Sequence, residues 1–493
     1  MAATTPQRIS TNPFRALLYE LRAERAADGP YPRGELRPSL ARTRRFERDP
    51  LPVLLEAHRS YGPVFTLRLL HAPFVFMLGP EANHYVTVAG ASNFIWREGS
   101  FGDMIPLLGD GLLTTDGAYH RRQRRTMLPA FHRERIEAAA EVMLSEARDA
   151  IDRWELGEQL DLYGWTRQLA LRIAMRALFG LDPDRGAAAE FDAAAEFERA
   201  LSFYGKDYAV RLLRGPRTPW ARMQRSRERL DRLIYSEIGR RRGTGSAHHG
   251  EDVLSLLLAA HDEDGQPLTE RELRDQVMTL LFAGHDTTTS TVSFLFYELA
   301  RKPQALARVL DEQDRVLPGG RAPTGSELWE SLPELERCIA ETLRLYPPAW
   351  IGPRRSLESF ELAGVHVPGG ALVAYCAWAS HRLPEVFPEP EAFVPDRFRP
   401  EARAEFPRGA YVPFGGGSRT CLGMRFGELE IKVIATIVLQ RFRLELVPGR
   451  TMQFRRSPTL SPREGLPVTI RERGLPEVVG PDRIVSPHRS ATA

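Results

Sequence analysis

The feature that most constrains this fold is one long helical segment near the middle of the chain. Thr269 and Glu272 form a capping box, with Thr as the N-cap and Glu three residues later. Helix-forming residues then continue to Arg301, and Pro303 ends the pattern. At ~1.5 Å per residue the helix would be roughly 48 Å long, which is enough to cross a large domain.

The rest of the chain predicts a mainly α fold with small β-sheets. Helical periodicity dominates residues 80–242, while short strand-like runs occur at residues 64–78 and 359–375. There is no internal repeat and no linker to a second catalytic module. We therefore expect an N-terminal extension over residues 1–45, a single catalytic domain over residues 46–473 and a flexible, Pro-rich C-terminal tail over residues 474–493.

Composition excludes several classes of protein. The 493 residues include 67 Lys and Arg against 64 Asp and Glu, a net charge of +3. A net charge so close to zero gives no long-range attraction for nucleic acid. No apolar run approaches the ~18 residues that span a bilayer, and the N-terminus resembles neither a signal peptide nor an anchor. Three cysteines are too few for a disulfide framework. We expect a cytoplasmic protein that binds no nucleic acid and has no membrane span.

One cysteine lies in an unusual glycine-rich loop. Residues 413–423 read Pro-Phe-Gly-Gly-Gly-Ser-Arg-Thr-Cys-Leu-Gly. The three consecutive glycines allow the backbone to approach a large flat group closely. Helical apolar spacing begins just after Cys421, so free N–H groups and the helix dipole would stabilise its thiolate. Such a thiolate is an electron-donating axial ligand for haem iron.

Other interpretations of this loop remain open on the residues alone. A single cysteine is most often a buried small apolar side chain, which is the interpretation for Cys338 and Cys376. A phosphate-binding loop would need G-x-x-x-x-G-K-[ST], and a nucleophile elbow would need glycine where Thr420 stands. No second Cys or His lies nearby at zinc-binding spacing. These residues favour a cofactor thiolate only modestly.

The same loop resembles a known family signature. Five residues match F-x-x-G-x-R-x-C-x-G, the haem-binding signature of the cytochrome P450 family: Phe414, Gly417, Arg419, Cys421 and Gly423. The resemblance extends over residues 50–473. It implies the cytochrome P450 fold, haem b (iron protoporphyrin IX) as cofactor, Cys421 as the ligand of its iron, and the other four residues as part of the cofactor site.

The middle of the long helix carries a second motif. Residues 283–288 read Ala-Gly-His-Asp-Thr-Thr, which taken alone could equally be a kinked or polar helix face. Small Ala283 and Gly284 would admit a flat macrocycle, and Asp286 with Thr287 could relay protons. The segment is similar to the family motif [AG]-G-x-[DE]-T-[TS]. This implies that Thr287 activates oxygen, with Asp286 as its acidic neighbour, and favours O₂-dependent over peroxide-dependent chemistry.

A salt-bridge motif follows in the expected order. Glu341 and Arg344 are three residues apart and can pair on one helix face, although an isolated E-x-x-R is most often an exposed ion pair. Residues 395–398, Pro-Asp-Arg-Phe, resemble the family's P-x-R-F. The resemblance implies a buried network in which Arg397 joins Glu341 and Arg344 to hold the cysteine loop.

Haem propionates need cationic or hydrogen-bonding partners. The resemblance points to Arg419, to Arg354, and to His120 with Arg124, since residues 116–124 resemble D-G-x-x-W-x-x-x-R with His120 in the place of Trp. Any one of these arginines could instead be a solvated surface side chain. Their neighbours Arg121, Arg122 and Arg125 are expected to face solvent, where they are equally consistent with a solvated face or with a docking surface for an acidic electron donor.

The resemblance also suggests a substrate pocket and an activity. The pocket candidates are mostly apolar, which favours a hydrophobic organic substrate: Phe94, Phe282, Ala283, Trp350, Ile351 and Leu460. We expect a haem-thiolate monooxygenase that inserts one oxygen atom of O₂, with electrons from a separate ferredoxin and ferredoxin reductase. Two alternatives are a haem-thiolate enzyme that couples or rearranges its substrate, and a haem-binding or gas-sensing protein without turnover. The Asp286–Thr287 pair argues against the second.

Overall fold

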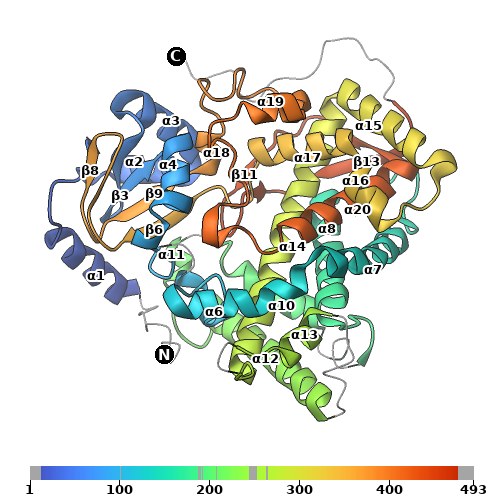
Figure 1. Ribbon diagram of the computed structural model, residues 1–493, viewed down its shortest axis with the longest axis horizontal. Helices are drawn as coiled ribbons and strands as arrows, with labels where there is room; N and C mark the ends of the chain where they lie inside the picture. Colours follow the sequence, from blue (N-terminus) through green and yellow to red (C-terminus); the bar gives the residue numbers. More distant parts are fainter. Residues whose placement is uncertain are drawn as a thin grey trace.

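The computed structural model describes residues 13–99, 102–186, 190, 192–206, 208–243, 252–262 and 265–475. The long central helix is α14 (Glu270–Arg301), which begins with the predicted capping box of Thr269 and Glu272. It runs through the middle of the molecule (Figure 1). In the described part of the chain the other α-helices are α1 (Pro13–Arg25), α2 (Leu40–Arg48), α3 (Pro50–Tyr61), α4 (Pro80–His84), α5 (Ile105–Leu108), α6 (Gly117–Met127), α7 (Arg133–Ile151), α8 (Leu162–Ile173), α10 (Ala193–Ser202), α11 (Tyr208–Arg211), α12 (Pro219–Gly243), α13 (Val253–Ala259), α15 (Pro303–Val316), α16 (Gly325–Glu330), α17 (Pro333–Leu345), α18 (Ala377–Ser380), α19 (Pro400–Ala404) and α20 (Met424–Arg441).

The core is organised around α14. Helices α8, α12, α17 and α20 all pack against it, and α7 packs on both α8 and α20. Most side chains of α14 between Leu273 and Leu299 are buried on every side of the helix. A helix surrounded in this way needs no polar face toward water, which is why its sequence lacks a clean amphipathic stripe.

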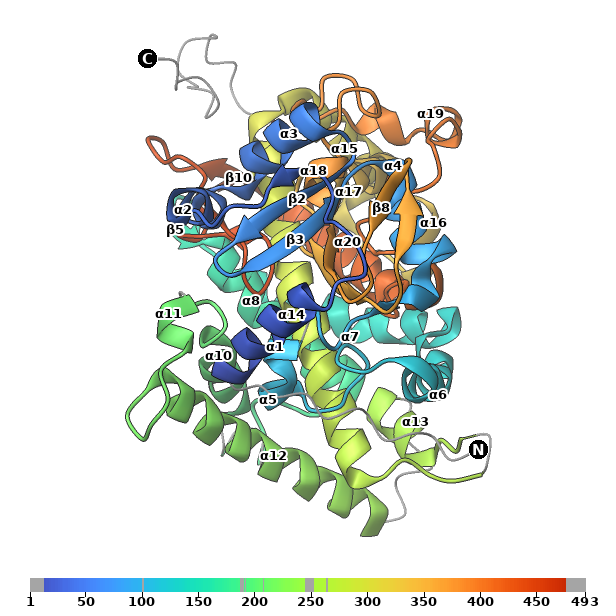
Figure 2. The same cartoon turned by 90° about the vertical axis from the view of Figure 1, so that its left-hand side faces the viewer.

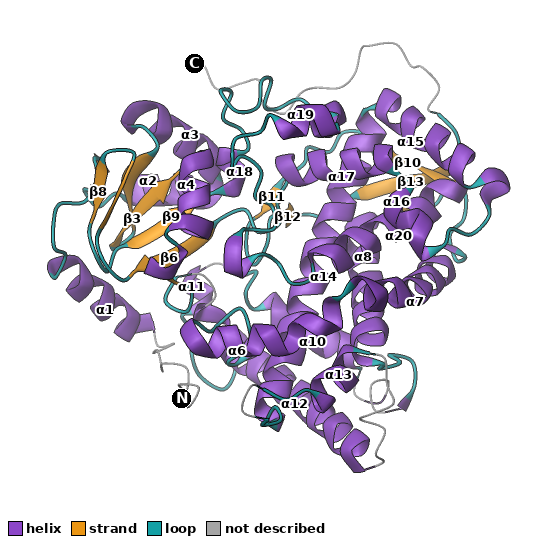
Figure 3. Cartoon of the chain, in the orientation of Figure 1, coloured by secondary structure: helices purple, strands orange, loops and turns teal. Residues whose placement is uncertain are grey.

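The strands form one larger sheet and several small ones. The six-stranded sheet has the order β1-β2-β3-β9-β6-β4, in which β2 and β3 form an antiparallel hairpin and β9 runs parallel to β3. Figure 3 shows most of these strands gathered on one side of the helical body. This arrangement confirms the predicted mainly α fold with small sheets. The described strands are β1 (Gly34–Glu35), β2 (Val64–Leu69), β3 (Ala72–Met77), β4 (Phe94–Ile95), β5 (Gln159–Asp161), β6 (Gly352–Ser356), β7 (Phe360–Leu362), β8 (Val365–Val367), β9 (Leu372–Tyr375), β10 (Phe442–Leu446), β11 (Phe454–Arg455), β12 (Ser461–Pro462) and β13 (Pro467–Glu472).

The ends of the chain bear on the predicted domain limits. Strand β1 pairs with β2 in the main sheet, and α2 continues across the expected boundary between residues 45 and 46. The division of the chain there stays a prediction, as does the flexible tail, most of which lies outside the described residues. Among the helices that are described, none combines the length and the apolarity that crossing a bilayer would require.

Candidate functional site

The cysteine loop folds back on itself before α20 begins. The N–H of Cys421 donates to the carbonyl oxygen of Phe414 at 2.9 Å, and α20 starts three residues later, at Met424. Gly417 has φ +60°, and a Cβ there would lie 2.4 Å from the carbonyl oxygen of Thr87. Only glycine fits such a position, so the glycines hold the loop tightly against the segment that carries Thr87.

Cys421 differs from the other two cysteines in its surroundings. Cys338 and Cys376 are buried, as the sequence suggests, whereas Cys421 is exposed. Burial by the surrounding atoms still raises the pKa of the Cys421 thiol, while the N–H of Gly423 and the charge of Arg124 lower it. The thiol therefore sits in a recess and keeps an accessible side, as a sulfur ligand to a bound group requires.

The central helix has one open face. Ala283, Gly284 and Thr287 keep accessible surface in a stretch of α14 whose neighbouring side chains are buried. Positions i, i+1 and i+4 lie on the same side of a helix. A Cβ built on Gly284 would meet no atom within 4 Å, and the hydroxyl of Thr287 donates to the carbonyl oxygen of Ala283 at 2.7 Å. This face is open to a flat group.

Helix α20 connects the cysteine loop to α14. The hydroxyl of Thr288 donates to Oε2 of Glu430 at 3.0 Å, two turns into α20. Glu430 is buried, and this burial raises its pKa to about 8. Glu430 was not predicted as a site residue, because its neighbours in the sequence do not indicate whether its carboxyl group is buried or exposed.

Asp286 belongs to a buried ion-pair network. Its side chain is 1% exposed, and its Oδ1 lies 3.1 Å from Nη1 of Arg167 on α8. The hydroxyl of Thr459 donates to its other carboxylate oxygen. Both oxygens of the acid are therefore held by partners from other segments of the chain.

The network continues from Arg167 to a third helix. Arg167 donates to Glu198 on α10 at 2.7 Å, and Oε1 of Glu198 lies 2.9 Å from Nε2 of His285. Burial alone would raise the pKa of Glu198, but the hydrogen bond and charge of His285 and the charge of Arg167 lower it to about 2. Three residues of this network were not predicted, because the spacing of residues in the sequence does not show which side chains from separate elements come into contact: Arg167, Glu198 and Thr459.

A second cluster gathers cations beside the cysteine loop. Arg419 donates to Oδ1 of Asp116 at 2.6 Å and to the carbonyl oxygen of Thr115 at 2.8 Å. The guanidinium groups of Arg354 and Arg419 lie 3.5 Å and 4.9 Å from the centre of the Trp96 ring. Burial lowers the pKa of each arginine to about 10, so both stay cationic at neutral pH. Trp96 was not anticipated from the sequence.

His120 and Arg124 extend this cluster on α6. His120 is buried, and burial together with the charges of Arg419, Arg124 and Arg121 lowers its pKa to about 3. A neutral imidazole can donate one hydrogen bond, and the surrounding arginines can attract an anion. The four residues predicted to hold propionates, His120, Arg124, Arg354 and Arg419, thus lie in one electropositive region.

One expectation for α6 is wrong. Arg122 does not face solvent: its guanidinium contacts Asp262 at 2.8 Å and Glu272 at 2.6 Å and ties α6 to the start of α14. Arg121 and Arg125 are exposed. The helix period turns Arg122 inward, on the same side as buried Gln123, whose side chain also donates to Glu272.

The structure brings Glu341, Arg344 and Arg397 together. Glu341 and Arg344 are both fully buried and 2.7 Å apart, and Nε of Arg397 lies 3.4 Å from Glu341. Arg344 also donates to the carbonyl oxygen of His381, whose Nε2 accepts from the N–H of Val412. The pair is thereby linked to the chain just before the cysteine loop.

Pocket candidates are only partly brought together. The ring of Phe94 packs edge-on against Phe360 at 5.4 Å in the core of the sheet, because β4 pairs with β6, and its place in the pocket stays a prediction. Trp350 turns into the main core, where its Nε1 donates to the carbonyl oxygen of Arg456. Leu460 is also fully buried, whereas Ile351 keeps accessible surface and Phe282 lies next to the open face of α14.

These residues fit the predicted haem. The accessible thiol can bind iron, the helix face of small residues leaves room for a flat ring, and the cluster of cations can pair with two propionates. Phe414 and Gly423 border the same loop and keep accessible surface.

Comparisons with known proteins agree with this site. The family model described as Cytochrome P450 matches residues 38–467. Cyclooctat-9-en-7-ol 5-monooxygenase of Streptomyces melanosporofaciens is 37% identical over 424 residues, covering 84% of this chain and 89% of that protein. Cyclooctatin synthase of the same organism is 38% identical over 351 residues, covering 70% of this chain and 75% of that protein.

Solved structures resemble the chain over most of its length. A cyanobacterial CYP120A1 with retinoic acid bound is 29% identical, with a TM-score of 0.78, and the match covers 90% of this chain and 99% of that one. The haem domain of cytochrome P450DA is 26% identical, with a TM-score of 0.81 and coverage of 90% and 98%. The likeness therefore includes both the helical body and the small sheets.

Proposed function

Since the chain belongs to the cytochrome P450 family, we propose that Sγ of Cys421 holds the iron of haem b, iron protoporphyrin IX, and that the open face of α14 covers its other side. The protein is a haem-thiolate monooxygenase that acts on an organic substrate. When bound, the haem would supply the iron at which dioxygen is activated, one oxygen atom entering the substrate and the other leaving as water.

The residues around the cysteine would hold and orient the cofactor. Arg354, Arg419, Arg124 and His120 are the groups that would bind its propionates, because they are cationic or can donate a hydrogen bond in one region. The glycines of the loop would allow the flat ring to lie against the backbone. Glu341, Arg344 and Arg397 would keep this loop in place from behind.

The observation that carries this proposal is the pairing of an open Thr287 with a buried Asp286. Thr287 lies on the accessible face of α14, where its hydroxyl donates to the carbonyl oxygen of Ala283, and the buried carboxylate of Asp286 is paired with Arg167. A carboxylate that receives a proton from the interior and an alcohol that passes it on form a relay. Arg167 and Thr459 act as positioning residues in this proposal, because they hold the carboxylate oxygens.

The substrate we propose is a hydrophobic organic molecule that enters beside Ile351 and Phe282. Apolar side chains near the open helix face support this choice. A cyclic alkenol of the kind that names the Streptomyces relative is the first compound to test. A library screen for absorbance shifts of the purified haem protein would identify ligands, and mass spectrometry of the products would separate hydroxylation from coupling or rearrangement.

Electrons would come from a separate acidic donor, a ferredoxin with its reductase. Arg121 and Arg125 are exposed beside the cofactor-binding face of α6 and would attract such a donor at low salt. Reversing both charges should slow reduction by the ferredoxin at low ionic strength. Unchanged reduction rates under those conditions would rule out this docking surface.

The compartment we propose is the cytoplasm. All three cysteines are free, and two of them are buried thiols without a partner sulfur. Such thiols are typical of proteins from reducing compartments. Cell fractionation should recover the protein with a cytoplasmic marker protein, and recovery with a periplasmic or secreted marker would contradict this compartment.

A further inference from the structure

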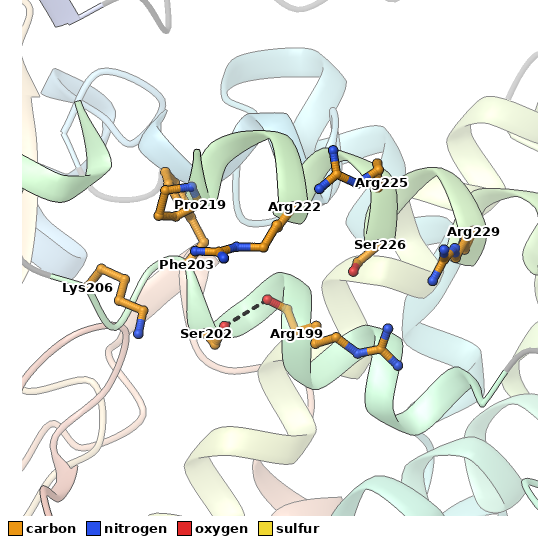
Figure 4. A pocket seen from close by; sticks show the side chains of 9 residues that line it. All are labelled: Arg199, Ser202, Phe203, Lys206, Pro219, Arg222, Arg225, Ser226 and Arg229. Carbon is orange, nitrogen blue, oxygen red and sulfur yellow. Dashed lines mark hydrogen bonds between the residues drawn. The ribbon is translucent and has the colours of Figure 1, made fainter. Parts of the chain in front are cut away.

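A groove of about 360 Å³ lies between α10 and α12 (Figure 4). These two helices are on the opposite side of α14 from the sheet-bearing part of the molecule (Figure 2). Its volume is in the range of small-molecule sites. The side chains that line it come from the end of α10 and the first three turns of α12: Arg199, Ser202, Phe203, Lys206, Pro219, Arg222, Arg225, Ser226 and Arg229. Five of these nine side chains are cationic and none is acidic.

Among the described residues, acidic side chains pair with only two of the five cations of this groove. Arg199 and Arg229 both pair with the buried Glu196, and Arg199 also lies 3.9 Å from a carboxylate oxygen of Asp192. Arg222 and Lys206 have no acidic partner among the described residues, and Arg225 donates only to a backbone carbonyl oxygen, that of Pro216, at 3.3 Å. Like charges gathered in this way repel one another unless an anion joins them.

The geometry of α12 directs these charges to one place. Residues 222, 225, 226 and 229 follow the i, i+3, i+4, i+7 spacing of a single helix face. The helix begins at Pro219, inside the groove, so the positive end of a 25-residue helix dipole adds to the same potential. Figure 4 shows the arginines of α12 along one side of the groove and Arg199 and Ser202 along the other.

The ligand chemistry follows from the number and kind of charges. The three cations that have no acidic partner in the described part of the chain exceed the single charge of a carboxylate, but they match a phosphate or a diphosphate group, which carries about two or more negative charges at neutral pH. Guanidinium groups bind phosphate oxygens in a bidentate way. Phe203 and Pro219 supply an apolar wall at one end, which suits the organic part of such a molecule.

We propose that the groove between α10 and α12 is a binding site for an organic phosphate or diphosphate, separate from the haem-thiolate site. The same chemistry could be presented by a free metabolite or by the headgroup of an anionic lipid. In both cases Arg222 and Arg225 bind the phosphate oxygens, and the ligand connects the two helices.

Isothermal titration of the haem-loaded protein with inorganic diphosphate tests the site. The double variant Arg222→Gln/Arg225→Gln should bind diphosphate about tenfold or more weakly, since two charge-assisted contacts are lost. The matched control is Arg232→Gln/Arg240→Gln, which removes the same charge from α12 outside the groove and should change the affinity less than about twofold. Arg222 and Arg225 form no ion pair with a described residue and both are exposed, so the variant should fold and keep its haem spectrum.

Flotation with vesicles separates the two sources. Phosphatidylcholine vesicles that contain phosphatidic acid should retain the parent protein and release the groove variant if a lipid headgroup is the ligand, and should retain neither if the ligand is free. Both results support the site. Equal diphosphate affinities in the parent and the groove variant, or equal losses in the groove and control variants, would overturn it, because binding would then be absent or would reflect only net charge.

Discussion

Nη1 of Arg167 lies 3.1 Å from Oδ1 of Asp286, although the two residues are 119 positions apart in the chain. One comes from α8 and the other from the centre of α14, and both side chains are largely buried. A buried carboxylate without such a partner would cost several kcal/mol. The carboxyl group of the residue next to Thr287 is therefore paired with a cation from another helix, and its role can be tested through that cation.

Arg167→Met should slow turnover about tenfold or more while the haem spectrum stays unchanged. The reason is that Asp286 loses the cation that fixes the position of its carboxyl group for proton transfer. The rate with substrate and its solvent isotope effect are the measurements. Arg167→Lys should restore part of the rate. Arg172→Met, on the same helix but paired with Glu146 and Asp184, is the control and should leave the isotope effect unchanged. An unaltered rate and isotope effect in Arg167→Met would contradict this positioning role.

Cys421→Ala should lose the red-displaced Soret absorption of the reduced, carbon-monoxide-treated protein, since that band depends on a thiolate bound to the iron. Cys338→Ala, which removes a buried thiol from α17, should keep it. Absorption spectra of both purified variants make the comparison. A Cys421→Ala protein with the thiolate band intact would mean that another sulfur holds the iron.

Thr287→Ala should bind haem normally but release hydrogen peroxide in place of product, because the hydroxyl on the open face no longer passes a proton. The ratio of product to electrons consumed measures this coupling. Thr289→Ala is the matched control: its hydroxyl also bonds four residues back, to His285, but it is fully buried. If Thr287→Ala keeps full coupling, the assigned role is wrong.

Glu341→Gln should lower the free energy of unfolding by about 3 to 5 kcal/mol, since Arg344 would remain buried without its charge partner. Denaturant titration followed by fluorescence provides the measurement. Glu336→Gln, on the same helix with a half-exposed ion pair to Lys432, should cost less than about 1 kcal/mol. Equal losses in the two variants would show that the Glu341 network has no special structural role.

Glu430 should make stability fall as the pH rises. Its pKa is about 8 in the fold and 4.5 in the reference state, so the folded protein binds the extra proton between those values. The stabilisation is complete below pH 4.5 and is lost as the pH rises to about 8, at a cost on the order of 4 kcal/mol. Glu430→Gln should remove this dependence. Parallel pH profiles of the unfolding free energy in the two proteins would contradict the assignment.

Features of this protein that depend on neighbours along the chain could be predicted from the residues alone. The capping box and Pro303 mark the two ends of α14, and the run of glycines marks the cysteine loop. Glu341 and Arg344 are three residues apart, a spacing that places them on one helix face. Each of these features follows from local backbone geometry. The predicted fold class, helical with small sheets, follows from the same local patterns.

Contacts between side chains that are far apart in the chain could be seen only in the folded structure. It pairs Asp286 with Arg167, turns Arg122 inward, buries Glu430 against Thr288, and packs Phe94 into the core of the sheet. Side-chain partners of this kind depend on how helices and strands pack across the core. The spacing of residues along the chain does not show which elements will pack together. The cationic groove between α10 and α12 has the same origin, since neither helix alone gathers its charges.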